Sequence, residues 1–263
     1  MTQNVNLNNH RILINRKRCQ DRKEKSSSKK KLAVDFTFEF LENLNTLKKP
    51  ETNQKSMLSI ILATHNKKKI EEIRAILNGL PVDLHTTLEF PDLAEVVEDK
   101  ETFKENALKK AKEIHAATGM NALADDSGLE VDALDGRPGV YSARYAGDGH
   151  PYEENNKKVL TELNHIPDDR RSARFHCVLA YVGRDRSGNY FEKFFDGVCE
   201  GRINHRPQGQ FGFGYDPIFF IPEFGRTMAE LEPDIKNGIS HRGRALEKFK
   251  EYIKNENPET GKK

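Results

Sequence analysis

Short apolar, β-prone runs alternate with amphipathic helical segments from Met57 onward, and this alternation restricts the possible folds most strongly. Residues 59–63 are almost entirely apolar, as expected of a buried strand. The next segment has apolar residues at helical spacing, at Ile70, Ile73, Leu77 and Leu80. Asn78-Gly79 supplies a signal for the end of this helix. The first convincing unit is therefore a strand, a loop and a helix.

The same alternation continues to the end of the chain. Thr102 and Glu105 match a capping box that begins a helix, and Gly119 suits its C-terminal end. We predict a strand at 122–124, a turn at Asp125-Asp126-Ser127-Gly128 and a returning strand at 129–134. Further predicted elements are a helix at 151–164, strands at 177–182, 190–203 and 217–221, and a last helix that opens at Ser240. Helices mixed with several adjacent strands predict an α/β fold with a mixed central β-sheet flanked by helices.

Residues 1–56 differ from the rest in charge. They hold 13 Lys and Arg against 6 Asp and Glu, whereas residues 57–263 hold 30 against 35. A segment so polar cannot support a core, so we predict a basic, disordered N-terminal extension, with a short amphipathic helix possible at 36–47. The extension is either a solvated tail or a tether for nucleic acid or anionic membrane, and the tail is the stronger expectation.

We expect one enzyme domain at 57–257 and a polar tail at 258–263. Translation starting at Met57 is a hypothesis that tryptic peptides from residues 1–56 would disprove. The three cysteines, Cys19, Cys177 and Cys199, are far apart, which argues against a zinc ribbon or a disulfide framework and favours a reducing compartment. The sequence has neither a run of about 20 apolar residues nor a secretory signal. We expect a cytoplasmic protein without membrane contact.

A loop rich in lysine follows the first strand. It comprises Thr64, His65, Asn66, Lys67, Lys68 and Lys69. Backbone N–H groups and the positive end of a helix meet there, which favours anion binding. A lysine-rich first turn that faces solvent is the alternative. The loop is not a Walker A motif, because its glycines are absent.

Two consecutive aspartates, Asp125 and Asp126, follow an apolar strand. Adjacent carboxylates are tolerated where a cation or hydrogen-bond donors neutralise them, and Mg²⁺ prefers such ligands. The acidic residues Glu95, Glu98 and Asp99 could add another ligand. An ordinary turn is the alternative, because Asp, Ser and Gly are all turn formers.

Two further segments complete an inventory for a nucleoside triphosphate. The glycine-rich segment 210–217 carries aromatic residues that could cover a base. Lys236 and Ser240-His241-Arg242, at the start of the last helix, add cationic and donor groups. Ser240 can also be a simple N-cap. Together the four segments predict a phosphate site, a metal site, a platform for the base and a second cationic clamp.

The chain resembles the inosine triphosphatase family over residues 58–254. Six motifs occur in the family's order: Ala63-Thr64-x-Asn66-x-x-Lys69, Thr102-Phe103-x-Glu105-Asn106-Ala107, Ala124-Asp125-Asp126-Ser127-Gly128-Leu129, Pro138-Gly139-Val140-Tyr141-Ser142-Ala143-Arg144-Tyr145, Phe213-Gly214-Tyr215-Asp216-Pro217 and Ser240-His241-Arg242. The chain departs from many members at His65, where they carry glycine. This difference should alter the backbone of the phosphate loop more than remove it.

The resemblance implies Mg²⁺-dependent hydrolysis of ITP, dITP and XTP to monophosphate and pyrophosphate, which cleanses the nucleotide pool. It implies two lobes around a nucleotide-binding cleft, and a homodimer. Asp126 is implied as general base and metal ligand, and Glu98 as second ligand, with Asp125 left open. The implied substrate contacts are Thr64, His65, Asn66, Lys67, Lys68, Lys69, Ser127, Phe213, Gly214, Tyr215, Asp216, Lys236, His241 and Arg242. The alternative is a pyrophosphatase for other modified nucleotides, such as a pyrimidine or a methylated base.

Overall fold

The computed structural model describes residues 57–256. The predicted extension at 1–56, its short helix at 36–47 and the tail at 258–263 lie outside the described residues. The expected domain limits at 57 and 257 therefore stay predictions, as does the expected division into two lobes.

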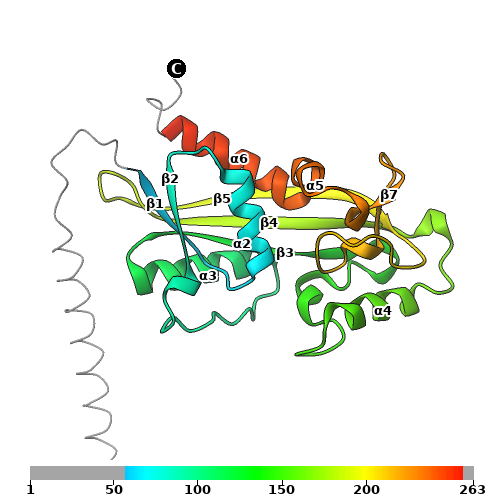
Figure 1. Ribbon diagram of the computed structural model, residues 1–263. Helices are drawn as coiled ribbons and strands as arrows, with labels where there is room; N and C mark the ends of the chain where they lie inside the picture. The colour runs from blue at the N-terminus through cyan, green and yellow to red at the C-terminus, as the bar shows by residue number, and fades with distance from the viewer. Residues whose placement is uncertain (1–56, 257–263) are drawn as a thin grey trace, which may run out of the picture. The chain divides into compact units, whose positions relative to one another are not determined.

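Within residues 57–256, seven strands form a single mixed sheet, as the sequence predicted (Figure 1). Their order across the sheet is β2-β1-β3-β4-β5-β6-β7. The first three are parallel to one another, and all later neighbours are antiparallel. The bounds are β1 Leu58–Leu62, β2 Val82–Thr86, β3 Asn121–Val131, β4 Ser172–Arg184, β5 Tyr190–Ile203, β6 Phe219–Ile221 and β7 Arg226–Thr227.

Helices cover both faces of this sheet (Figure 1). They are α2 Lys67–Leu77, α3 Phe103–Thr118, α4 Tyr152–Glu162, α5 Pro233–Ile239 and α6 His241–Glu256. Short 3₁₀ helices span Thr87–Glu89, Asp132–Leu134, Gly139–Arg144, Asp168–Arg170, Asp216–Ile218 and Met228–Glu230. Apolar residues of α2 and α6 share one core with β1, β3 and β4, while those of α3 form a separate core against the same strands. The two cores therefore lie on opposite faces of the sheet, and α4 packs in a third, beside β3 to β6.

Local sequence signals fix the ends of the helices. The Thr102 hydroxyl accepts from the Glu105 amide at 3.2 Å, which confirms Thr102 as the N-cap of α3. This is one half of the predicted capping box, because the Glu105 carboxylate accepts at 2.9 Å from the Thr102 hydroxyl rather than from the Thr102 amide. Gly119 ends α3 in the left-handed conformation, with φ of 71°. Ser240 caps α6, because its hydroxyl accepts from the Gly243 amide at 3.1 Å. Lys236 lies on the separate helix α5, which the sequence reading had not resolved from α6.

The predicted turn at residues 125–128 is wrong, because β3 runs straight through them. Asp125 lies opposite Leu179 and Asp126 opposite Val178 in an unbroken ladder with β4. The ladder to β4 outweighs the turn preference of these residues. Gly128 is required for space: a Cβ atom there would come within 2.5 Å of the Gly139 carbonyl oxygen.

Continuous β3 also changes how its two aspartates relate. Successive side chains of a strand point to opposite faces of its sheet. Asp125 therefore points toward α2 and α6, whereas Asp126 points toward α3. The two carboxylates therefore have different ion-pair partners: Lys69 and Arg242 contact Asp125, whereas Lys110 contacts Asp126.

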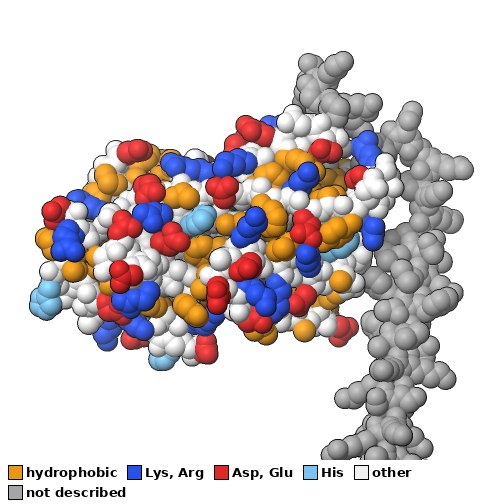
Figure 2. All heavy atoms as spheres, turned by 180° about the vertical axis from the view of Figure 1, so that it is seen from behind, with side chains coloured by type: hydrophobic (Ala, Val, Ile, Leu, Met, Phe, Trp, Pro, Cys, Tyr) orange, Lys and Arg blue, Asp and Glu red, His pale blue; other side chains and the backbone are white. Residues whose placement is uncertain are grey.

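The surface and the helix lengths agree with the composition. On the face seen in Figure 2, Lys and Arg are interspersed with Asp and Glu. Within residues 57–256, each helix is too short or too polar to cross a bilayer.

Candidate active site

A cavity of about 460 Å³ lies where β1 ends and β3 continues. β1 pairs with β3 only from Asn121 to Leu123. Beyond Leu123 the edge of β3 faces the loop that follows β1, and Asp126, Ser127 and Gly128 line the cavity there. Because this edge is open, side chains from both faces of the sheet can reach the same space. The ends of parallel strands are a common place for ligand sites in α/β sheets.

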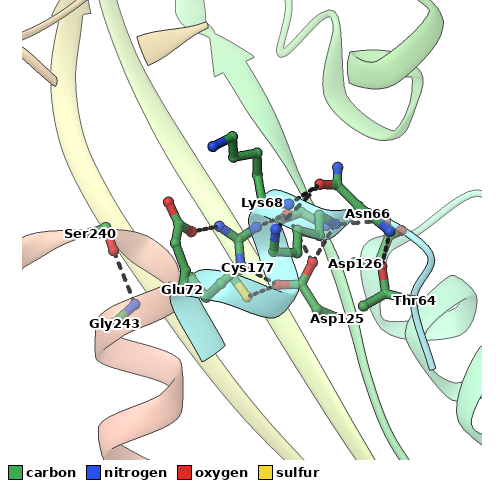
Figure 3. Close-up of polar contacts among 12 residues, drawn as sticks. Thr64, Asn66, Lys68, Glu72, Asp125, Asp126, Cys177, Ser240 and Gly243 are labelled. Carbon is green, nitrogen blue, oxygen red and sulfur yellow. Dashed lines mark hydrogen bonds and ion pairs between the residues drawn. The ribbon is translucent and has the colours of Figure 1, made fainter. Parts of the chain in front are cut away.

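Asp125 collects donors on the α2 and α6 side. Its Oδ1 accepts from the Lys69 ammonium group and from the Ser127 hydroxyl at 3.2 Å. Its Oδ2 accepts from Arg242 Nε at 2.9 Å and from the Cys177 thiol at 3.1 Å (Figure 3). Burial opposes its ionisation, but Arg242 and Lys69 outweigh burial and hold the pKa of Asp125 well below its usual range. Both carboxylate oxygens of Asp125 already accept hydrogen bonds, so Asp125 holds the side chains of Lys69 and Arg242 in position.

Asp126 has contrasting surroundings on the α3 side. Its Oδ2 is buried and has no hydrogen-bond partner within residues 57–256. Its Oδ1 lies 3.7 Å from Lys110 Nζ, which also contacts Glu98 Oε1 at 2.5 Å and the Asp125 carbonyl oxygen at 2.7 Å. Burial raises the pKa of Asp126 to about 6; Lys110 opposes this shift and Glu98 adds to it. Oδ2 of Asp126 is therefore a buried oxygen that is available to accept a hydrogen bond or to bind a cation.

The carboxylates of Asp126 and Glu98 fit a magnesium ion. Lys110 contacts both, so they lie on one side of the cavity. The unpartnered Asp126 Oδ2 is a hard oxygen donor, which Mg²⁺ prefers. In the described part of the chain, no group of three or more acidic, His or Cys side chains could hold a metal. Mg²⁺ commonly takes one or two carboxylates with phosphate and water, so two suffice.

The loop after β1 sends only part of its predicted set into the cavity. Asn66 caps α2, accepting from the Lys68 and Lys69 amides at 3.0 and 3.2 Å. The Thr64 hydroxyl accepts from the Asn66 amide at 3.2 Å, which fixes the loop. Lys67 and Lys68 are exposed and do not line the cavity. Lys68 points away from Asp125 in Figure 3 and pairs with Glu71 at 3.1 Å.

The part of the cavity around Phe213 combines an aromatic ring with paired charges. Lys236 Nζ lies 2.7 Å from Asp216 Oδ2, 2.7 Å from Glu72 Oε1 and 5.0 Å from the centre of the Phe213 ring. Arg242 contacts the other Glu72 oxygen at 2.5 Å. Burial lowers the pKa of Lys236, but Asp216 and Glu72 outweigh it and raise the pKa overall. Lys236 is therefore charged, and Phe213 lies beside a fixed cation.

His241 lies in this part of the cavity as a neutral side chain. Its ring stacks on Phe175 with centroids 4.7 Å apart and an interplanar angle of 17°. Burial, with Arg242 nearby, holds the pKa of His241 well below its usual range. Among the described residues its Nδ1 has no partner. An uncharged imidazole with an unused nitrogen can recognise a polar ring substituent.

All predicted site residues except Lys67 and Lys68 line one cavity. They are Thr64, His65, Asn66, Lys69, Glu98, Asp126, Ser127, Phe213, Gly214, Tyr215, Asp216, Lys236, His241 and Arg242. The residues that sequence reasoning missed include Glu72, which pairs with Lys236 and Arg242, Lys110, which joins Asp126 to Glu98, and Tyr152, which lines the cavity. Only Lys110 left a signal, because it lies next to Ala111 on the apolar side of the predicted helix.

The fold and the cavity define an α/β protein with a site for an anionic, ring-containing ligand, because cations, acidic groups and an aromatic ring line one cavity. The chain belongs to the Ham1 family, whose sequence model matches residues 60–252.

Two relatives and one solved structure agree with this assignment. The chain is 51% identical over 197 residues to a dITP/XTP pyrophosphatase of Geobacter sulfurreducens, which covers 75% of this chain and 97% of the relative. It is 46% identical over 198 residues to a dITP/XTP pyrophosphatase of Bacillus cereus, and the match covers 75% of this chain and 96% of the relative. The structure of a HAM1 protein from Coxiella burnetii superposes with a TM-score of 0.69 at 43% identity, covering 76% of this chain and 100% of that one.

Proposed function

We propose that this Ham1-family chain hydrolyses deaminated purine nucleoside triphosphates (ITP, dITP and XTP) to the monophosphate and pyrophosphate. The observation that carries the proposal is a single cavity that is lined by Lys69, Asp126 and Glu98 and also by Phe213 and Arg242. Two relatives named dITP/XTP pyrophosphatase, at 51% and 46% identity, support the substrate class.

Asp126 is the proposed general base. Its buried Oδ2 is unpartnered among the described residues, so it is available to orient and deprotonate a water molecule. Mg²⁺ held by Asp126 and Glu98 would supply charge neutralisation at the phosphoryl oxygens. Lys69 and Ser127 would bind the remaining phosphate oxygens.

The part of the cavity around Phe213 explains the preference for deaminated bases. Phe213 can stack on a purine, and hypoxanthine and xanthine carry an acceptor at position 6. Donors from Arg242 or His241 satisfy that acceptor. Adenine carries a donor at the same position, so its amino group and these donors would face each other without acceptors. Sites of this kind can discriminate by about 10⁴-fold or more.

Pyrophosphate release tests the proposal. The assay uses ITP, dITP, XTP, GTP and ATP, with Mg²⁺ and with EDTA. We expect turnover of the first three in Mg²⁺ and loss of activity in EDTA. Asp126→Asn should abolish turnover, whereas Asp196→Asn, at an exposed position on β5, should leave it unchanged. Faster turnover of modified pyrimidine triphosphates than of ITP would overturn the proposal in favour of the alternative class.

We also propose a homodimer, on the family resemblance, and a cytoplasmic location, on the spacing of the three cysteines. Light scattering of the full chain tests the dimer, and fractionation of cells tests the location. The basic extension as a nucleic-acid tether is the weaker reading. Salt-dependent RNA or DNA binding that disappears on deleting residues 1–56 would support it.

A further inference from the structure

Lys110 is a buried cation beside the two carboxylates that are proposed to hold the metal. It lies on α3, and the residue is only 7% exposed. Its Nζ atom is 2.5 Å from Glu98 Oε1 and 3.7 Å from Asp126 Oδ1, and the side chain lines the cavity. The chain therefore supplies a cation of its own to this pair of carboxylates.

The contacts of Lys110 fix both the ammonium group and its partners. Besides bonding Glu98, the group donates to the Asp125 carbonyl oxygen at 2.7 Å, so it is tied to the main chain of β3. The Glu98 carbonyl oxygen in turn accepts from Arg144 at 3.0 Å. Two carboxylates that lie close together repel each other. Lys110 offsets this repulsion and holds Asp126 and Glu98 around one ammonium group.

Lys110 leaves free the oxygen that is best suited to a metal. Its contact with Asp126 is to Oδ1, whereas Oδ2 of Asp126 has no hydrogen-bond partner within residues 57–256. One hard oxygen donor of the kind that Mg²⁺ prefers is thus still available. Lys110 therefore changes the charge that a metal meets in the cavity more than it changes the ligands.

The balance of charge around the two carboxylates is incomplete without a ligand. Asp125, the neighbouring acidic residue, already has two cationic partners of its own. Asp126 and Glu98 bring two negative charges and Lys110 offsets one of them, so a single negative charge remains. Like charges repel strongly where water is scarce. A divalent cation therefore binds less tightly beside Lys110 than it would to the same two carboxylates alone.

A triphosphate supplies the negative charge that the site lacks. Mg²⁺ is commonly held by one or two carboxylates together with substrate phosphates and water. The phosphate oxygens would complete the ligand set and outweigh the repulsion from Lys110. The metal is then bound firmly only when the triphosphate is bound with it.

We propose that Lys110 is a positioning residue that stands in for part of the metal's charge in the free protein. It holds Asp126 and Glu98 together and weakens their binding of Mg²⁺ until the triphosphate arrives. The inference rests on the proposed function, because that function places Mg²⁺ at these two carboxylates. It assigns Mg²⁺ to the incoming nucleotide, as a magnesium–triphosphate complex, rather than to the free protein as a tightly bound ion.

Titration of Mg²⁺ alone into the metal-free full chain tests the proposal. Isothermal titration calorimetry at pH 7.5 compares the unmodified chain with Lys110→Met and Lys110→Gln. Both changes remove the charge, and glutamine keeps an amide donor for the neighbouring oxygens. We expect the dissociation constant for Mg²⁺ to fall about tenfold or more in both variants, because a nearby like charge is gone. A residue with a merely structural role would give the opposite result, since its loss would loosen the site.

Urea unfolding in EDTA and in excess MgCl₂ provides a second readout. The Lys110 variants should lose stability in EDTA, because a buried carboxylate is left without its cation. Mg²⁺ should restore more stability to them than it adds to the unmodified chain, because a ligand that binds the folded state more tightly stabilises it more. This measurement also applies to a variant that folds only when the metal is present.

Lys109→Gln is the matched control. Lys109 is the preceding residue of α3, bonds Asp99 at 2.9 Å and the Val97 carbonyl oxygen at 2.8 Å, and does not line the cavity. Its replacement should leave the affinity for Mg²⁺ unchanged.

Two results would overturn the role of Lys110. One is Mg²⁺ binding in the Lys110 variants that is no tighter than in the unmodified chain. The other is a loss of the fold in both variants that Mg²⁺ does not restore. Pyrophosphate release from ITP by the unmodified chain is measured alongside. Its absence would refute the proposed function itself, so the two failures are distinguished.

Discussion

Replacing each of the adjacent aspartates of β3 with asparagine should have opposite effects on stability. Asp125→Asn removes the negative charge from a buried site where Lys69 and Arg242 both contact it. The Arg242 side chain is only 2% exposed, so its charge cannot turn to water. Removing one partner of a buried ion pair costs about 3–5 kcal/mol. We expect the free energy of unfolding to fall by that amount at pH 7.5.

Asp126→Asn should leave the metal-free protein as stable as before, or more stable. The pKa of Asp126 is raised from 3.8 to about 6, so the ionised form is disfavoured in the folded state as pH rises through this range. The shift corresponds to about 3 kcal/mol at pH 7.5, which bounds the gain. Asp125 has the opposite sign: its lowered pKa stabilises the fold above about pH 4, and that contribution is lost as pH falls.

Urea unfolding followed by circular dichroism, in EDTA at pH 7.5, compares the two variants with the unmodified chain. Equal m-values would show that the same surface is exposed in each case. Adding Mg²⁺ should stabilise the unmodified chain and not Asp126→Asn, because a ligand that binds only the folded state raises its stability. Two results would refute the reasoning. One is a fall in the free energy of unfolding that is as large in Asp126→Asn as in Asp125→Asn. The other is a fall below about 1 kcal/mol in Asp125→Asn.

Three further predictions concern space, pH and binding. Gly128→Ala should lower the free energy of unfolding in urea by about 1–3 kcal/mol, because its Cβ would lie 2.5 Å from Gly139 O and Ser142 Oγ. Gly238→Ala is the control, because open space surrounds Gly238, and it should not lower the free energy of unfolding. Equal losses in the two variants would contradict the prediction. As pH falls below about 6.5, the unfolded pKa of histidine, the unmodified chain should lose stability faster than His241→Gln. The reason is that the pKa of His241 is lower in the folded state, so only the unfolded state takes up the proton. Urea midpoints of the two proteins that stay parallel between pH 7.5 and 5 would count against this prediction. Lys69→Ala should raise KM for ITP about tenfold or more, as expected for a lost charged hydrogen bond, and an unchanged KM would exclude Lys69 as a phosphate contact.

Local signals in the sequence were enough for most of the fold. The N-cap Thr102 and the left-handed Gly119 depend on neighbours a few residues away, and both ends of α3 agree with the structure. The same local logic failed at residues 125–128. Their turn preference is weak compared with ten consecutive pairings between β3 and β4, whose partners lie about fifty residues further along the chain. Strand β2 was missed because it is short and only half buried.

The site shows the same division. The predicted residues that follow β1 or lie on β3 line one cavity, because the sequence predicted these two strands. Partners were harder to find, since they depend on contacts across the fold. Glu72 reaches Lys236 and Arg242 from 164 and 170 residues away. Lys67 and Lys68 were included with Lys69, although the 3.6-residue period of α2 turns them toward solvent.

The shared contacts of Asp125 have a consequence for protein engineering. One carboxylate holds both Lys69, in the first turn of α2, and Arg242, in the first turn of α6. In the proposed reaction Arg242 binds the base and Lys69 binds the triphosphate, so a substitution at Arg242 that changes base preference is expected to change triphosphate binding as well. Epistasis of this kind makes single-site libraries uninformative. A library that varies positions 69, 125 and 242 together offers the shorter route to a new substrate.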